Sequence, residues 1–251
     1  MKKKKTLRAV KLVIGFDGTR YEGWQSQRNN NTIQEILEKN LSKIFSGEKI
    51  NLHGSSRTDS GVHAKGLVAH FSAQSALPDE KIKDALNFYL PGDIVVLEAA
   101  TVGSDFHARY GAKSKIYQYD IWNDRTRPLF QAPYVLWYPN SLNVTSMKKA
   151  AAHFIGEKDF RAFKDSGDEK KNTVRTVKKL SVQKKGSLIR ITIQADGFLT
   201  HMVRVIAGTL MEAGRGRVRA ADIPAILRSK DRRKAGPTAK ALGLTLVKVI
   251  Y

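Results

Sequence analysis

The first hundred residues alternate between short apolar runs and stretches in which apolar side chains recur at helical spacing. Runs rich in Val, Leu and Ile predict three strands, at residues 7–16, 67–71 and 94–102. The helical spacing predicts two helices, at residues 33–44 and 78–89. Thr32 and Glu35 have the spacing of a capping box for the first helix, and Pro78 suits the first turn of the second.

The rest of the chain continues this mixture of short elements. Residues 115–122 alternate with period two, which places Tyr117, Tyr119 and Ile121 on one face of a strand. Lys184-Lys185-Gly186 marks the turn of a hairpin. The other predicted strands are 174–182, 187–195 and 244–251, and the other predicted helices are 143–155, 201–213 and 222–228.

The order of the elements predicts an α+β fold. Strand, helix, strand, helix and strand are followed by a similar mixed pattern, as expected of two α/β lobes built on antiparallel sheets. No strong period persists between residues 102 and 111, so we expect an N-terminal lobe at 1–106 and a C-terminal lobe at 107–251.

Charge narrows the class of partner. The 251 residues include 44 Lys and Arg against 23 Asp and Glu, a net charge of +21, which favours a nucleic acid over a neutral ligand. A merely basic, soluble surface is the alternative. The absence of cysteine excludes disulfides and thiol nucleophiles. Lys2 to Lys5 suggest a solvated tail that can touch phosphate, and the interrupted apolar run behind them is neither a signal peptide nor a membrane span.

Asp59 stands in a turn-forming run, 54–64, two residues after Arg57. The ordinary interpretation is a turn residue, since Asp-Ser-Gly suits a turn and an aspartate can bond its own backbone. A functional site is the alternative, because Arg57 is near enough in the chain to keep Asp59 ionised. Residues 62–66 also lengthen the loop beyond a minimal turn.

Arg204 lies in a predicted helix that is apolar almost all round, which indicates a buried helix. A buried arginine needs an acidic partner or a bound anion, and Asp59 is the natural candidate. Gly208, one turn later, would clear space beside it. The alternative is that Arg204 extends to the surface.

Three other groups have more than one interpretation. Tyr117 is either a core residue of its strand or a platform on which an extruded base stacks. His53, His63 and His70 lie near Asp59 but lack the spacing of a metal site, so structural roles are favoured. Basic residues gather late in the chain and are either a solvated face or an anion-binding surface: Arg215, Arg217, Arg219, Arg228, Lys230, Arg232, Arg233 and Lys234, with Lys164, Lys170 and Lys171 as a second group.

Seven short motifs resemble those of the TruA-type tRNA pseudouridine synthases and follow one another in order. The most specific is Ser56-Arg57-Thr58-Asp59-Ser60-Gly61-Val62-His63-Ala64. The others are Gly23-Trp24-Gln25-Ser26-Gln27 with Thr32-Ile33-Gln34, Leu86-Asn87 with Leu90-Pro91-Gly92-Asp93-Ile94, Phe106-His107-Ala108-Arg109 with Tyr117-Gln118-Tyr119, Asp159-Phe160-Arg161-Ala162-Phe163, Gly197 to Arg204, and Gly243-Leu244-Thr245-Leu246.

This resemblance implies an enzyme that isomerises uridine to pseudouridine in the anticodon stem-loop of tRNA, at tRNA positions 38 to 40. It implies Asp59 as nucleophile, Tyr117 stacked on the target base and Arg204 paired with Asp59. Arg57 would hold the base out of the stem, and Leu244 would line the uracil pocket. The family likeness further implies a cytoplasmic homodimer in which each tRNA touches both subunits, with no cofactor or metal. It implies two lobes that share a central sheet and a positively charged cleft.

Two departures from the family pattern are visible. Ser56 stands where many members have Gly, and Lys240 stands where Pro is more usual, which bears on the shape of the loop before Leu244. The chemistry suits the residues, since a carboxylate can attack either the base or the ribose, and the sequence leaves that choice open.

Two rival functions remain to be weighed. Asp59-Ser60-Gly61 and Asp165-Ser166-Gly167 both spell the aspartic-protease triplet, but that mechanism needs two carboxylates sharing a proton, and the second triplet lies in a charged loop. A non-catalytic RNA-binding protein of the same fold is the other rival. The presence of Arg57, Asp59, Tyr117 and Arg204 together argues against it.

Overall fold

The computed structural model describes residues 6–27, 31–167 and 171–251 and divides the chain into two compact units. Unit 1 is Met1–Lys113 with Leu246–Tyr251, and unit 2 is Ser114–Thr245. The predicted tail, Lys2 to Lys5, lies outside the described residues, as do residues 168–170 of the charged loop. In the part of the chain that is described, no helix is both long and apolar enough to cross a membrane.

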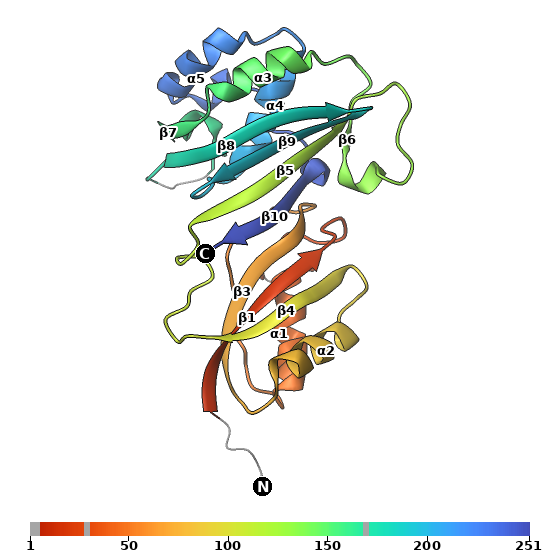
Figure 1. Ribbon diagram of the computed structural model, residues 1–251, viewed down its shortest axis with the longest axis vertical. Helices are drawn as coiled ribbons and strands as arrows, with labels where there is room; N and C mark the ends of the chain where they lie inside the picture. Colours follow the sequence, from red (N-terminus) through yellow and green to blue (C-terminus); the bar gives the residue numbers. More distant parts are fainter. Residues whose placement is uncertain (1–5, 28–30, 168–170) are drawn as a thin grey trace. The chain divides into compact units, whose positions relative to one another are not determined.

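Unit 1 is a sheet with two helices (Figure 1). Its strands lie in the order β4-β1-β3-β10, with β2 beside β3, and β1 is antiparallel to both β3 and β4. Helix α2 packs against β4 and against α1. The elements are β1 (Thr6–Phe16), α1 (Ile33–Ile44), β2 (His53–Gly54), β3 (His63–Ser75), α2 (Asp79–Tyr89), β4 (Ile94–Val102) and β10 (Leu244–Ile250).

The core of unit 1 follows from the two periods in its sequence. Every second residue of β1 is fully buried at Val10, Leu12 and Ile14, and so are Ile33, Leu37 and Leu41 on the apolar stripe of α1. The capping box predicted for α1 is wrong, because the Thr32 side chain accepts no capping hydrogen bond. The first free N–H groups of the helix are satisfied by the main chain instead: Ile33 donates to the carbonyl of Gly23, and Gln34 donates to that of Trp24.

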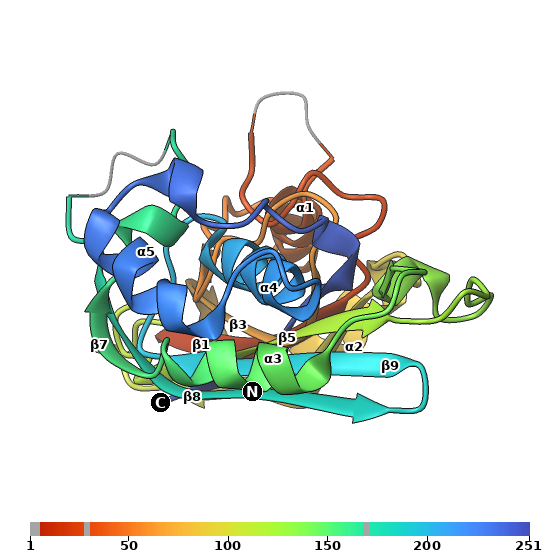
Figure 2. The same ribbon diagram turned by 90° about the horizontal axis from the view of Figure 1, so that it is seen from above.

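Unit 2 has its own set of paired strands and its own helices. Strands β5, β9, β8 and β7 lie in this order and are antiparallel, while β6 runs parallel to β5. Figure 2 shows α3, α4 and α5 gathered beside this sheet, and α3 packs against both β8 and α4. The strands and helices are β5 (Ser114–Trp122), β6 (Leu136–Trp137), α3 (Val144–Ala152), β7 (Gly156–Asp159), β8 (Val174–Lys185), β9 (Leu188–Ala195), α4 (Met202–Gly214) and α5 (Ile223–Ser229). Short 3₁₀ turns span Ala132–Tyr134, Arg161–Phe163, Ala220–Asp222, Arg232–Lys234 and Ala241–Gly243.

Helix α4 is the core of unit 2, as its apolar sequence predicts. All of its residues are buried except Arg204 and Glu212. The predicted helix 143–155 is correct at its start, where the Asn143 side chain accepts the N–H of Ser146, but α3 ends at Ala152. The next three N–H groups turn back to carbonyls three residues earlier, which tightens the chain before β7 begins.

The predicted fold class is confirmed at the level of each unit, where helices pack on antiparallel sheets. The expected lobes at 1–106 and 107–251 differ from the observed units, since residues 107–113 and 246–251 pack in unit 1. Tyr251 illustrates this, because its hydroxyl donates to the carbonyl of Ala108 at 2.6 Å. A shared central sheet and a positively charged cleft stay predictions.

Candidate active site

The Asp59 loop joins β2 to β3 and is held by main-chain hydrogen bonds from a neighbouring segment. Trp24 N–H donates to the carbonyl of Thr58 at 3.1 Å, and Gly61 N–H donates to that of Tyr21 at 3.2 Å. Val62 N–H donates to the carbonyl of Asp59 itself, at 3.2 Å, which closes a turn. The turn interpretation is therefore correct for the backbone, and it leaves the carboxylate at intermediate exposure.

Gly23 allows the supporting segment to approach this loop closely. Its φ of +90° lies in the region that favours glycine. A Cβ at this position would lie 2.5 Å from the carbonyl oxygen of Thr58, inside any permitted contact. The segment that begins at Gly23 thus packs directly against the Asp59 loop and helps to fix its backbone. It also receives the first N–H groups of α1, so helix, segment and loop form one connected framework.

Arg57 and Asp59 line one open pocket in unit 1, together with Glu22, Gln25, Gln27, Thr58 and Ser60. The sequence suggested an ion pair between Arg57 and Asp59. In the residues that the structure describes, the Arg57 guanidinium takes part in no ion pair or hydrogen bond, so that pair does not form. The arginine is exposed instead and is available to an incoming ligand.

Two of the three histidines near Asp59, His63 and His70, have structural partners. His63 Nδ1 accepts the N–H of Gly18 at 3.1 Å, and His70 Nδ1 accepts that of Ala108 at 3.2 Å. Burial lowers the pKa of His70, and the neighbouring His107 and His53 lower it further. No group of three or more His, Cys, Asp or Glu side chains within the described ranges is arranged to hold a metal ion.

Arg204 lies on α4 at intermediate exposure and fastens the segment after α5. Its Nε donates to the carbonyl of Ala239 at 2.8 Å, while Ala239 N–H donates to the carbonyl of Arg204 at 3.1 Å. Gly208 does clear space, but for the main chain: a Cβ there would lie 1.8 Å from the carbonyl oxygen of Pro237. The pairing of Arg204 with Asp59 joins residues of different units and stays a prediction.

Tyr117 lies on β5 opposite Ile193, on the buried face that its period-two pattern predicts. Its ring meets Phe198 edge-on, with centroids 5.1 Å apart. Leu244 is buried and opens β10 directly after a 3₁₀ turn. Their roles as base platform and pocket wall stay predictions.

The loop before Leu244 is fixed by Tyr119, whose hydroxyl donates to the carbonyl of Lys240 at 2.8 Å. Lys240 has φ −58° and ψ 148°, the conformation that a proline would impose. The backbone at Lys240 therefore already has angles that a proline could adopt.

The sequence did not predict the pair between Asp165 and His201. The Asp165 carboxylate lies 2.6 Å from His201 Nδ1. The backbone N–H of Gly167 holds the pKa of Asp165 below its usual value, helped by His201. An ionised, paired Asp165 is unsuited to sharing a proton with another carboxylate. Asp165 therefore cannot serve as the second carboxylate that an aspartic protease would need beside Asp59. The sequence hinted at this pair only in that Asp165 belongs to the triplet Asp165-Ser166-Gly167 and His201 to the motif Gly197 to Arg204.

Most of the late basic cluster is neutralised locally. Arg215 and Arg217 contact Glu212, Arg219 contacts Asp222, Lys230 contacts Asp159 and Arg233 contacts Asp231. Each pair lies on one element or on neighbouring elements. The cluster is therefore a face of exposed ion pairs more than a uniform anion-binding surface.

Comparison with known proteins identifies the chain's relatives. The family model described as "tRNA pseudouridine synthase" matches residues 12–111 and 150–251, which include Asp59, Arg204 and Leu244 but not Tyr117. tRNA pseudouridine synthase A of Thermoanaerobacter sp. (strain X514) is 48% identical over 245 residues, which is 98% of this chain and 100% of that protein. The protein of the same name from Acetivibrio thermocellus is 46% identical over the same shares of both chains.

Among solved structures, a Cbf5-Nop10-Gar1 complex aligns with 99% of this chain at 10% identity, and this chain spans 59% of that one. The TM-score of 0.35 is too low to support a conclusion about the fold. The family assignment therefore rests on the family model and on the relatives identified by sequence. The chain belongs to the tRNA pseudouridine synthase family, whose members are isomerases that convert uridine to pseudouridine.

Proposed function

We propose that this enzyme forms pseudouridine in the anticodon stem-loop of tRNA, at tRNA positions 38 to 40, with Asp59 as its nucleophile. The observation that carries the proposal is the Asp59 loop itself. Main-chain hydrogen bonds to Tyr21, Trp24 and Val68 hold its backbone, and Asp59 and Arg57 line the same open pocket. A covalent mechanism needs a carboxylate in a fixed position that the substrate can reach.

The other residues take roles that suit their chemistry. Arg57, whose guanidinium has no partner in the described chain, would hold the uridine out of the stem. Tyr117 would stack on the extruded base, and Leu244 would form an apolar wall for the uracil. Arg204 would keep Asp59 ionised through its charge. Neither a cofactor nor a metal is needed for this isomerisation.

We further propose that the enzyme works as a cytoplasmic homodimer and that tRNA lies in a positively charged cleft. Leu129 and Phe130 support a contact between copies, because their exposed fractions of 79% and 84% are large for apolar side chains. The net charge of +21 supports a polyanionic substrate.

Replacing the nucleophile tests the proposal. We expect Asp59→Ala to lower pseudouridine formation on tRNA at least about a thousandfold, as is typical when a covalent catalyst is removed. Binding of the same tRNA should persist, because the carboxylate repels phosphate. Asp84→Ala, on the exposed face of α2, is the matched control and should retain activity. Turnover by Asp59→Ala above the uncatalysed background would refute the assignment of the nucleophile.

The site on the RNA needs a second measurement. Mapping pseudouridine in tRNA from cells that lack this gene should show losses confined to the 3′ side of the anticodon arm. Losses elsewhere would contradict the proposed positions while leaving the reaction itself intact. A tRNA that is bound but never modified by the purified enzyme would favour the non-catalytic RNA-binding rival.

A further inference from the structure

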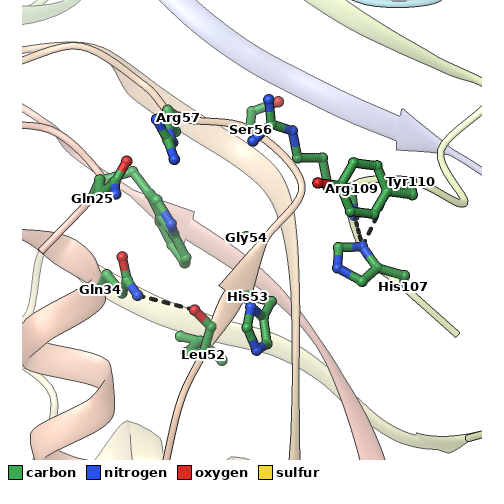
Figure 3. A pocket seen from close by; sticks show the side chains of 11 residues that line it. Gln25, Gln34, Leu52, His53, Gly54, Ser56, Arg57, His107, Arg109 and Tyr110 are labelled. Carbon is green, nitrogen blue, oxygen red and sulfur yellow. Dashed lines mark hydrogen bonds between the residues drawn. The ribbon is translucent and has the colours of Figure 1, made fainter.

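A second hollow lies beside the Asp59 pocket, entirely within unit 1, with a cavity volume of about 180 Å³ (Figure 3). Four of its lining residues carry basic side chains: His53, Arg57, His107 and Arg109. We call it the basic hollow. None of its lining residues is acidic. A lining of this composition attracts an anion.

The two arginines of the basic hollow are not neutralised. Within the described ranges, neither Arg57 nor Arg109 takes part in an ion pair or a hydrogen bond through its guanidinium, although Arg109 lies over the Tyr110 ring at 5.9 Å. Both are exposed. This differs from Arg219 and Arg233, whose guanidinium groups are each held by a carboxylate on the same short element. Only an arginine without a carboxylate partner has its guanidinium N–H groups available for bidentate hydrogen bonds to a new anion.

His107 is oriented as a donor by the backbone around it. Its Nδ1 accepts the N–H of Arg109 at 3.1 Å and that of Tyr110 at 3.2 Å (Figure 3). With Nδ1 occupied as an acceptor, the neutral ring carries its proton on Nε2, and that N–H is left as a donor. His107 therefore supplies a hydrogen bond to an anion without first having to become charged.

The walls of the hollow are fixed by polar groups that are already committed. Gln34 donates to the carbonyl of Leu52 and to Glu38, and its oxygen accepts the N–H of Ser26. His53 stacks on His70 with ring centroids 5.1 Å apart, and His70 in turn accepts the N–H of Ala108. The basic side chains with remaining capacity are thus the arginines, His107 and the exposed His53, and the buried Ser56 hydroxyl has no partner among the described residues either.

Two residues connect the basic hollow with the catalytic loop. Arg57 and Gln25 line both the hollow and the pocket that contains Asp59. An RNA strand that presents a uridine to Asp59 has a phosphate on either side of that nucleotide. Arginine forks and imidazole N–H groups match a phosphate's oxygens, and phosphate contacts set the register of a bound strand without reading its sequence.

We propose that the basic hollow binds a backbone phosphate of the RNA strand next to the uridine delivered to Asp59, with Arg109 and His107 as positioning residues. This inference rests on the proposed function, because it takes RNA as the ligand. It gives the Phe106-His107-Ala108-Arg109 motif a task, which is to hold the strand in register while Arg57 acts on the base.

The test asks whether the Arg109 side chain and one particular phosphate of the RNA contribute to binding through the same contact. Anticodon stem-loop RNAs are made with a single uncharged methylphosphonate, moved one position at a time around the target uridine. For the wild-type enzyme we expect the Kd to rise about tenfold at one position, the usual effect of losing a charge-assisted hydrogen bond. For Arg109→Gln, the unmodified RNA should already bind about tenfold more weakly, and the same methylphosphonate should add less than about twofold.

Two further variants separate recognition from structure. His107→Asn keeps an acceptor for the two backbone N–H groups but removes the Nε2 donor, and it should show the same coupling to a smaller degree. Lys81→Gln, on exposed α2, removes an equal charge and should show none. The slope of log Kd against log salt concentration should fall by about 1 for Arg109→Gln, as expected when one phosphate contact is lost, and should not change for Lys81→Gln.

The outcomes distinguish the two proposals. If the increases in Kd caused by Arg109→Gln and by the methylphosphonate simply multiply at every position, the two do not share a contact. That result would overturn the phosphate site, even if pseudouridine forms normally. Intact coupling in an enzyme that forms no pseudouridine would instead overturn the proposed function and leave the phosphate site standing.

Discussion

At the scale of single residues, the candidate nucleophile is positioned mainly by backbone. The Asp59 loop is fixed by main-chain bonds to Tyr21 and Trp24, and Gly23 is needed because any side chain there would strike Thr58. A loop backbone held in this way does not depend on the rotamers of neighbouring side chains. Its position is sensitive, however, to any atom added between the two segments.

Gly23→Ala should therefore damage both stability and catalysis. The left-handed φ and the 2.5 Å approach to Thr58 should together cost about 1–3 kcal/mol of unfolding free energy, and kcat should fall more than tenfold as the loop shifts. Gly47→Ala is the matched control, because Gly47 has a φ of +89° but no atom within 4 Å of an added Cβ. It should lose stability without losing activity. Equal kcat values in both variants would show that Gly23 does not shape the site.

At the scale of elements, sequence patterning predicted most of the long elements, but β3 extends beyond the expected 67–71 at both ends, to His63–Ser75. Strands β4 and β5 and helix α2 appear almost as expected, since each presents a full apolar face. Strands β2, β6 and β7 were missed because two to four residues cannot display a period. The capping box at Thr32 failed for a tertiary reason: carbonyls of Gly23 and Trp24 reached the helix N–H groups first.

The candidate site was predicted unevenly for related reasons. Asp59 could be singled out because its loop composition is local information. The basic hollow could not, since it needs His53 and Arg109 to be brought together through the sheet of unit 1. The boundary expected at residue 106 separated those residues, because nothing in a local pattern shows that residues 107–113 pack with the chain's final strand.

The 3₁₀ turn before β10 supports a prediction about a whole element. Removing the hydroxyl in Tyr119→Phe leaves the Lys240 carbonyl without this donor and should lower the unfolding free energy by about 1 kcal/mol. Lys240→Pro should be neutral or slightly stabilising, because the backbone already has the angles of proline. Urea denaturation measures both. A large loss of stability in Lys240→Pro would mean that its N–H or side chain is needed.

At the scale of the whole molecule, the proposed homodimer makes a direct prediction. Light scattering should give the mass of two chains for the wild type, and Phe130→Asp should shift it toward one chain, because a carboxylate cannot be buried unpaired in an apolar contact. Phe88→Asp is a matched control, since Phe88 is 81% exposed on α2 in the other unit. Dissociation by Phe88→Asp, or a dimer that survives Phe130→Asp, would place the contact elsewhere.

The final strand has a consequence for how the enzyme is made. Residues 246–251 complete unit 1, yet they are synthesised after all of unit 2. While the chain grows on the ribosome, unit 2 has its full complement of residues first, although it comes later in the sequence. Unit 1, which carries Asp59, must wait with the edge of β3 uncovered. Unit 1 is thus the last of the two units to be completed, because its sheet lacks β10 until residues 246–251 have been made.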